Sequence, residues 1–260
     1  MSETGAAAQF TLLGSAGDPI DGADPRLAEL YAYPDDLRRC WVRGNMIASV
    51  DGGATADGKT ARLGAAGDRA VFEQMRYAAD VILVGAATVR TENYSGAQVP
   101  VDQRGARQAR GQAEVPPIAV LTRSGDLDPG SRFFTHTEVT PLVFTCTARL
   151  HDTRTRLGAA AEVLDASGAD PDDVDPAVAL TALADRGLLR VLTEGGPVIL
   201  GLLIGRDLLD ELCLTIAPYL VGGAARRIAD GPGEVLSRMR PAHVLSDADG
   251  YLYTRYVRSR

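Results

Sequence analysis

Short apolar runs alternate with segments of helical spacing along most of this chain. Val81–Gly85, Ile118–Leu121 and Leu142–Thr145 are free of charged residues, and each has the length of a single strand. A strand that is apolar on both faces needs helices on both sides of its sheet, as in largely parallel α/β folds. We therefore expect an α/β fold with a mostly parallel central sheet and helices on both faces.

The remaining elements follow from periodicity and from glycine and proline signals. Further strands are expected at residues 41–50, 161–164, 189–193, 211–221 and 243–258, the last bent at Asp249-Gly250, and helices at residues 67–79, 176–186 and 197–204. The two C-terminal strands could pair antiparallel at one edge. Residues 95–117, rich in Gly, Gln and Arg, are expected to be a mobile loop with at most one short helix.

The domain organisation predicted from the sequence is simple. Residues 1–40 are expected to form a partly helical N-terminal extension, because Leu27, Leu30 and Leu37 lie at near-helical spacing. Residues 41–260 are expected to form one domain, since α/β domains often reach this size.

Composition limits the classes of partner. A net charge of −7 and a pI near 5.0 argue against a broad nucleic-acid surface, although a local basic pocket for a phosphorylated ligand is compatible with them. No apolar stretch approaches the length of a membrane span, and the start at Met1–Gly5 does not resemble a secretory signal. We expect a soluble, cytoplasmic protein with a small-molecule partner.

The three cysteines and three histidines suggest neither a disulfide framework nor a metal site. Cys40, Cys146 and Cys213 are far apart and odd in number, and no histidine lies in a recognisable nucleophile motif. We expect core thiols and no bound metal.

The first candidate site is the turn Glu194-Gly195-Gly196-Pro197, between an expected strand and an expected helix. Glycines at such a turn let backbone N–H groups approach a phosphate, and the helix dipole favours its negative charge. The same residues would also make a tight turn in a protein without a ligand.

The second candidate is Asp68. On a helix, Asp68 aligns with Phe72 and Met75, so its carboxylate points toward the core, while Glu73 on the other side could pair with either Arg69 or Arg76. A carboxylate in a first helical turn can simply complement the helix dipole. Beside a cleft it would instead have a raised pKa, and it could bind an N–H of a heterocycle or help to protonate it.

Two further segments follow strands. In residues 85–92, the small residues Gly85 and Ala86 allow a flat ring or a phosphate chain to approach, and Thr88 can donate to phosphate; simple helix packing explains them equally. Thr122-Arg123-Ser124 offers two hydroxyls and a guanidinium, which suit the 2′-phosphate that distinguishes NADPH from NADH.

Four segments in this order resemble one known family. They are residues 49–52 (SVDG), 80–89 (DVILVGAATV), 193–197 (TEGGP) and 210–223, which contains Asp210-Glu211-Leu212 and ends in APYLVGG. Together they resemble the pyrimidine reductase domain of riboflavin biosynthesis, which shares the dihydrofolate reductase fold. The resemblance covers about residue 41 to the C-terminus.

The resemblance implies NADPH-dependent reduction of 5-amino-6-(5-phosphoribosylamino)uracil to its ribityl form by a homodimer. We expect Asp68 and Glu194 to be catalytic by orienting the heterocycle; in dihydrofolate reductases a helix carboxylate at a place comparable to Asp68 binds the pterin and assists its protonation. The resemblance also implies cofactor contacts at Ala48, Arg62, Gly85, Ala86, Thr88, Glu92, Thr122, Arg123, Ser124, Gly195, Gly196, Pro197, Val198, Ile199 and Leu200, and substrate contacts at Asp51, Thr60, Asp68, Arg76 and Glu194. The zinc deaminase that is often fused to this domain has His-x-Glu and Pro-Cys-x-x-Cys motifs, which this chain lacks, so no deaminase activity is expected.

The chain departs from the family at one position near the expected site. The family commonly has Asp-Gly-Lys after the first strand, but here Gly53 follows Asp51-Gly52 and the next lysine is Lys59. This departure, together with Asp68, leaves a second reading open, the reduction of a dihydropterin or dihydrofolate. A third reading is a non-catalytic, regulatory NADPH-binding protein, because fold and binding motifs do not by themselves establish activity.

Overall fold

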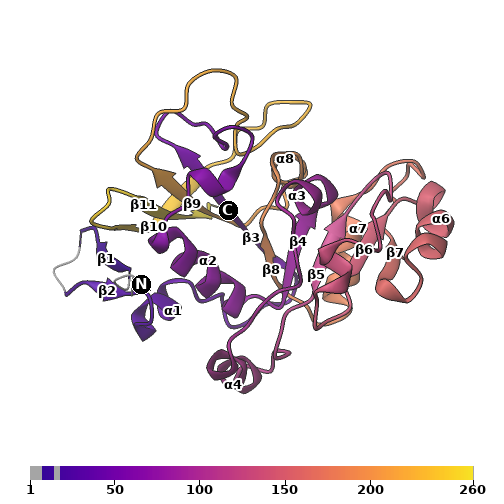
Figure 1. Ribbon diagram of the computed structural model, residues 1–260, viewed down its shortest axis with the longest axis horizontal. Coiled ribbons are helices and arrows are strands. Elements are labelled where there is room, and N and C mark those ends of the chain that lie inside the picture. The colour runs from indigo at the N-terminus through magenta and orange to yellow at the C-terminus, as the bar shows by residue number, and fades with distance from the viewer. Residues whose placement is uncertain (1–7, 15–17, 260) are drawn as a thin grey trace.

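A computed structural model describes residues 8–14 and 18–259 of the chain (Figure 1). The described residues form one eleven-stranded sheet in the order β2-β1-β10-β11-β9-β3-β8-β4-β5-β6-β7. Its parallel part consists of β3 (Trp41–Ser49), β4 (Val81–Gly85), β5 (Ile118–Leu121), β6 (Leu142–Thr145), β7 (Glu162–Asp165), β8 (Arg190–Thr193) and β9 (Glu211–Ala217). The expected mixed α/β fold with a mostly parallel sheet is confirmed.

The antiparallel edge is built from both ends of the chain. β11 (Leu252–Arg258) pairs with β9 and with β10 (Met239–Ser246), and β10 also pairs with β1 (Gln9–Leu12), which pairs with β2 (Ile20–Asp21). The prediction of one bent strand over residues 243–258 is wrong: the segment is a hairpin. The Asp247 carboxylate accepts hydrogen bonds from the backbone N–H groups of Asp249 and Tyr251, both at 3.0 Å, and so closes the turn.

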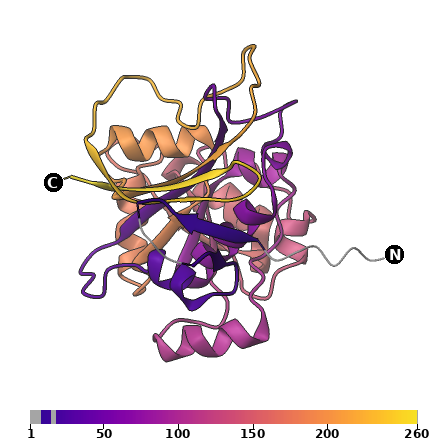
Figure 2. The same cartoon turned by 90° about the vertical axis from the view of Figure 1, so that its left-hand side faces the viewer.

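Helices cover both faces of the sheet (Figure 2). They are α1 (Pro25–Leu30), α2 (Ala66–Ala78), α3 (Ala86–Thr91), α4 (Val101–Ala109), α5 (Arg132–Thr135), α6 (Thr147–Leu157), α7 (Pro176–Ala184) and α8 (Pro197–Gly205), with short 3-10 turns at Thr60–Arg62 and Gly158–Ala160. Alternate residues of β4 point to opposite faces of the sheet. Ile82 and Val84 join the core under α2, whereas Val81 and Leu83 join the core under α7 and α8.

Two features of these elements were not anticipated. α6 was not predicted, because it is largely polar and buries only Thr153 and Leu157. The stretch at 95–117, expected to hold at most one short helix, contains the nine-residue α4. Strand β9 ends at Ala217 rather than at residue 221.

The N-terminal segment is held to the sheet by a buried cluster of charges. The Glu211 carboxylate accepts from Arg43 Nε at 2.5 Å and from Arg255 Nε at 2.9 Å, and the side chains of Arg43 and Glu211 are fully buried. These two arginines also donate to carbonyl groups at the C-terminal end of α1. Arg255 Nη1 donates to Leu30 O at 2.5 Å, and Arg43 Nη1 donates to the O atom of the next residue, Tyr31, at 2.6 Å. The charges therefore satisfy backbone groups that α1 leaves unpaired.

The structure bears on the expectation of no membrane span but not on the expectation of no secretory signal. None of the helices in residues 8–14 and 18–259 has the length and hydropathy of a membrane-spanning segment. Met1–Gly5, on which the expectation of no secretory signal depends, lies outside the described residues.

Candidate functional site

The cavity forms where one strand of the parallel sheet stops early. β8 ends at Thr193 and pairs with β3 only as far as Gly44, while β3 continues to Ser49 along β9. The continuing stretch of β3 therefore lines a space above the end of β8, at the carboxyl edge where ligands bind in such sheets. The cavity measures about 880 Å³, and its walls come from β3, residues 54–64, α2, α3, Tyr94, the turn at 194–197 and residues 221–226.

The turn at Gly195–Gly196 joins the two strands on either side of this space. Gly195 has a φ of +76°, its carbonyl accepts from Gly85 N at 2.8 Å, and the Gly195–Gly196 peptide is cis. The positive φ favours glycine at this position, and a Cβ there would also lie 3.0 Å from Met46 Sδ. The turn delivers the start of α8 to the cavity, with Pro197 at its first position and no side chain capping its N-terminus.

A second helix begins beside α8. α3 follows β4 directly, also without a side-chain cap, and a Cβ at Gly196 would lie 2.8 Å from Thr88 Oγ1. Two neighbouring helix N-termini with unpaired N–H groups and a threonine hydroxyl form a donor set that suits a phosphate chain. The residues present therefore fit the diphosphate of a dinucleotide cofactor.

Asp68 reaches the cavity from the first turn of α2, one turn before Phe72, and both residues line it. Burial raises the pKa of the Asp68 carboxyl above its ordinary value, although a hydrogen bond from the Thr215 hydroxyl and the charge of Arg69 oppose this. The inward direction and raised pKa expected from the helical spacing are both present.

Glu194 lies at the floor of the cavity in a network of three side chains. Its carboxylate, 3% exposed, accepts from Arg76 Nε at 2.6 Å and Nη2 at 2.8 Å, and from the Tyr94 hydroxyl at 2.6 Å. The expectation that Arg76 lies on the outer side with Glu73 is wrong, because Arg76 turns inward across the Phe72 ring, 4.3 Å from its centroid. Burial is the largest single effect on the pKa of Arg76 and lowers it, but the charge of Glu194 and the hydrogen bonds to Glu194 and Tyr94 together raise that pKa.

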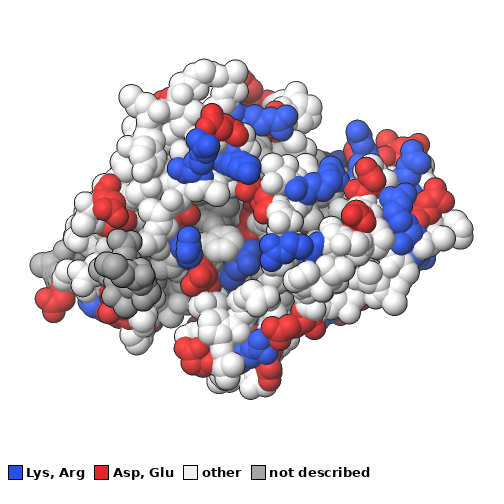
Figure 3. All heavy atoms as spheres, viewed as in Figure 1, with Lys and Arg blue, Asp and Glu red and all other residues white. Residues whose placement is uncertain are grey.

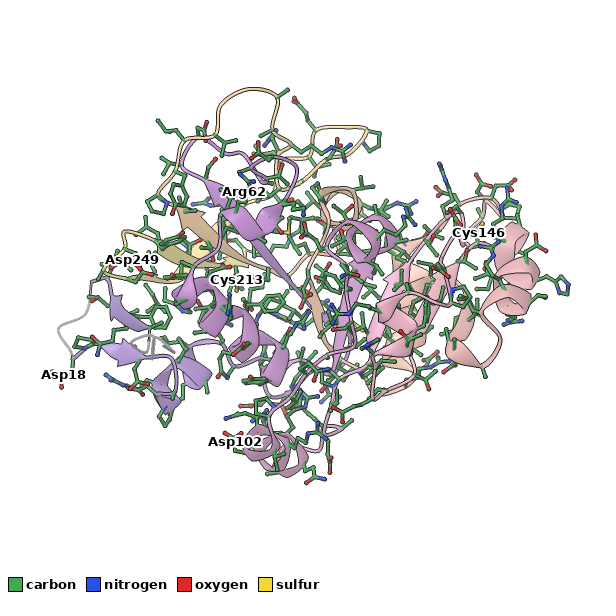
Figure 4. The ribbon with its side chains drawn as sticks, viewed as in Figure 1. Asp18, Arg62, Asp102, Cys146, Cys213 and Asp249 are labelled. Carbon is green, nitrogen blue, oxygen red and sulfur yellow. The ribbon has the colours of Figure 1, made fainter. Side chains whose placement is uncertain are left out.

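Thr60 and Glu92 also line the cavity and contact each other. The Thr60 hydroxyl donates to Glu92 Oε1 at 3.0 Å. Arg62, an expected cofactor contact, lies outside the lining and pairs with Asp57 on the surface (Figure 4).

Asp51 does not line the cavity but connects two loops beside it through hydrogen bonds. Its carboxylate accepts from the Ser49 hydroxyl at 2.5 Å, from Gly222 N at 2.7 Å and from Val221 N at 3.1 Å, and these bonds lower the pKa of Asp51 to about 2. They join the loop after β3 to the loop after β9. Gly53 lies in the same junction, where a Cβ would lie 3.1 Å from Ala225 Cβ.

The other predicted contacts do not line the cavity. Ala48, Ala86, Ile199 and Leu200 are buried in the core, Val198 is exposed, and Gly85 contacts the Gly195 carbonyl. Thr122 and Ser124 accept hydrogen bonds from the backbone of Gly125 and Asp126, so the triplet containing Arg123 forms the turn after β5. Their roles as cofactor contacts stay predictions.

Several lining residues were missed by sequence reasoning. They are Asn45, Met46, Thr55, Asp57, Tyr94 and Arg226. Asn45 interrupts an apolar strand, which is a recognisable signal. Arg226 follows the family-like text APYLVGG, to which no site role was assigned. Tyr94 carried no local signal, because its partner Glu194 is 100 positions away.

The charges around the cavity are mixed (Figure 3). The face is hollowed near its centre, and acidic and basic side chains gather around the hollow. No three His, Cys, Asp or Glu side chains within the described part of the chain are grouped as a metal site. Cys40, Cys146 and Cys213 are buried free thiols, and the last two lie in separate parts of the sheet (Figure 4).

Comparison with known proteins gives consistent matches. The profile of the RibD C-terminal domain matches residues 40–253. The chain is 25% identical over 218 residues to the 2,5-diamino-6-ribosylamino-4(3H)-pyrimidinone 5′-phosphate reductase of Archaeoglobus fulgidus, covering 83% of this chain and 97% of that protein.

Solved structures agree in fold. A pyrimidine reductase-like protein from Corynebacterium diphtheriae is 27% identical with a TM-score of 0.76, covering 85% of this chain and 92% of that one. A riboflavin biosynthesis reductase from Saccharomyces cerevisiae has a TM-score of 0.64 at 15% identity, covering 90% and 99% of the two chains, and shows the shared fold alone.

Proposed function

Because the chain belongs to the RibD C-terminal domain family, we propose that it is an NADPH-dependent reductase of 5-amino-6-(5-phosphoribosylamino)uracil. The observation that carries this proposal is the cavity itself, which is lined by a half-buried carboxylate on α2 and by the uncapped starts of α3 and α8. The first feature suits a heterocycle and the second suits a dinucleotide phosphate.

The nicotinamide cofactor, when bound, would supply a hydride. Thr88 would hold its phosphates through its hydroxyl, and Gly196 and the first turns of α3 and α8 would hold them through backbone N–H groups, to which Pro197 contributes none. The 2′-phosphate recognised by Arg123 or Ser124 remains part of this proposal.

The chain's own contribution to the reaction is to position the substrate and to supply a proton. Reduction of the open-chain ribosylimine adds hydride at the sugar carbon and a proton at the attached nitrogen. Asp68, with its raised pKa, retains a proton to higher pH than an exposed aspartate and can deliver it or hold a ring N–H. Glu194, fixed by Arg76 and Tyr94, would accept a hydrogen bond from the substrate in a constant orientation.

Asp68 also favours a second candidate. A carboxylate that faces a heterocycle accepts N–H groups, and a dihydropterin offers an exocyclic amine beside its ring N–H. The 2,5-diamino pyrimidinone for which the Archaeoglobus fulgidus relative is named offers the same pair of donors, whereas a uracil has a carbonyl in place of the amine.

These candidates are separated by the loss of NADPH absorbance with three substrates: the phosphoribosylaminouracil, the 2,5-diamino pyrimidinone and dihydrofolate. We expect turnover of a phosphoribosylaminopyrimidine and little turnover of dihydrofolate. No turnover of either pyrimidine beside clear turnover of dihydrofolate would overturn the leading proposal. NADPH binding without oxidation by any of the three would instead support a regulatory protein.

We propose a cytoplasmic homodimer as the working form, on the strength of the family resemblance. Light scattering coupled to gel filtration tests the dimer: the chain mass is 27.4 kDa, so a particle of about twice that mass is expected.

A further inference from the structure

The cavity carries more negative than positive charge. Four carboxylates line it, from Asp57, Asp68, Glu92 and Glu194. Among the lining residues, all within the described part of the chain, Arg226 is the one cation. A phosphorylated ligand entering this space would be repelled unless a cation offsets the carboxylates.

The other arginines near the cavity are already engaged. Arg76 is bound to Glu194 by two hydrogen bonds, and Arg62 is paired with Asp57. In contrast, the Arg226 guanidinium makes no hydrogen bond or ion pair with any residue in 8–14 or 18–259. Its five N–H donors are available to a ligand.

Arg226 belongs to a segment fixed at both ends, residues 221–231, which we call the strap. At one end Asp51 accepts the N–H groups of Val221 and Gly222. At the other end Asp230 N donates to Pro197 O at 3.0 Å. The strap therefore runs from the loop after β3 to the start of α8, and Figure 1 shows its loop beside the loop after β3.

The backbone of Arg226 is itself anchored. Ala54 N donates to Arg226 O at 2.8 Å, and the preceding Ala225 packs on Gly53. A larger residue at position 53 would push this part of the strap away from the cavity. The backbone from which the Arg226 side chain extends is therefore fixed to Ala54 on the cavity wall.

We propose that Arg226 is the residue that recognises a phosphate in this cavity. This inference rests on the proposed function, which supplies two phosphate-bearing ligands: the diphosphate of the dinucleotide and the phosphate monoester of the substrate. Both present oxygens that a guanidinium can bind in a bidentate manner, in a cavity that the start of α8 also lines.

Direct binding measurements test the proposal without requiring turnover. NADPH and the phosphoribosylaminopyrimidine are titrated separately, by fluorescence and calorimetry, into the wild type and into Arg226→Gln, Arg226→Lys and Arg227→Gln. Arg227 is the matched control, because it is an exposed neighbour with the same charge outside the cavity lining.

We expect Arg226→Gln to weaken one of the two ligands at least tenfold, Arg226→Lys to weaken it less, and Arg227→Gln to leave it within about twofold. A selective loss for NADPH identifies the diphosphate, and a selective loss for the pyrimidine identifies the monoester. The inference is overturned if Arg226→Gln binds both ligands as the wild type does, or if the wild type binds neither. Binding that depends on Arg226 without NADPH oxidation would reject only the proposed reaction.

Discussion

At Asp68, burial raises the pKa of a carboxyl that also faces the cavity. Below the pKa of an unfolded aspartate, both the folded and the unfolded chain hold the proton, and the shift has no effect on stability. As the pH rises from the pKa of the unfolded chain through the raised pKa of the folded chain, Asp68 ionises in the unfolded chain first. The free energy of unfolding therefore falls over this range. Asp68 therefore costs the folded chain stability at neutral pH, as functional residues often do.

We predict that Asp68→Asn lowers kcat by about 100-fold or more, because it removes a proton donor, while NADPH affinity stays within about twofold. The wild-type kcat should fall as the pH rises through the pKa of Asp68, and the variant should lack this limb. The variant should also unfold at a higher temperature than the wild type at pH 7. Steady-state kinetics across pH and thermal denaturation measure these effects; unchanged kcat in the variant would contradict the assigned role.

Glu194 belongs to a buried ion pair, for which loss of one partner is costly. We predict that Glu194→Gln lowers the free energy of unfolding by about 3 kcal/mol, since it leaves the Arg76 charge without its bidentate partner. Urea denaturation measures this loss. The control is Glu162→Gln: Glu162 pairs with Arg186 but is 51% exposed, so the expected cost is below about 1 kcal/mol. Equal costs in the two variants would show that burial of the Glu194 pair is not what matters.

Among the elements, α8 and the strap pack against each other with no room for a side chain. A Cβ at Gly201 would lie 2.1 Å from Asp230 O, which is a backbone atom. The helix therefore holds one end of the strap through this glycine, in addition to the hydrogen bond at Pro197.

We predict that Gly201→Ala displaces the strap from α8, lowers the free energy of unfolding by about 1–3 kcal/mol and weakens NADPH binding several-fold. Gly205→Ala is the matched control in the same helix, because a Cβ there meets nothing within 4 Å. It should be neutral or stabilising by up to about 1 kcal/mol. Denaturant titration and NADPH titration of both variants measure the difference; the two alanines behaving alike would contradict the packing argument.

For the whole molecule, the N-terminal segment is part of the packing rather than an appendage to it. Phe10, Leu27 and Tyr31 are fully buried, and β1 extends the sheet beyond β10. Without this segment, Arg43 and Arg255 would lose the carbonyls of residues 30–32 as acceptors.

We predict that a chain starting at residue 41 loses most of its stability, whereas a chain starting at Ala8 keeps it. Removal exposes apolar core surface and leaves buried arginine N–H groups without partners, and each of these is costly. Circular dichroism with thermal denaturation compares the two chains. A truncated chain as stable as the full one would show that residues 41–260 are an independent domain, as the sequence suggests.

The local sequence predicted much of this architecture. The apolar runs and their glycine boundaries indicated the parallel strands, and the helical spacing of Asp68 with Phe72 placed that carboxylate toward the core. Both depend on side chains that are close along the chain, where periodicity reports burial directly. The short β1 and β2 and the polar α6 carry little of that signal, so they were missed.

The sequence by itself determined the strand and helix periodicity, and with it the carboxyl edge at which Gly195-Gly196 lies. The tertiary structure alone decided which distant charges meet, Arg76 with Glu194 across 118 positions and Arg43 with Glu211 across 168. It also decided that Arg226 and the start of α8 line one cavity. Periodicity records which face of an element is buried. The partner of a buried charge is instead selected by strand order and loop course, which bring together segments whose local patterns are independent.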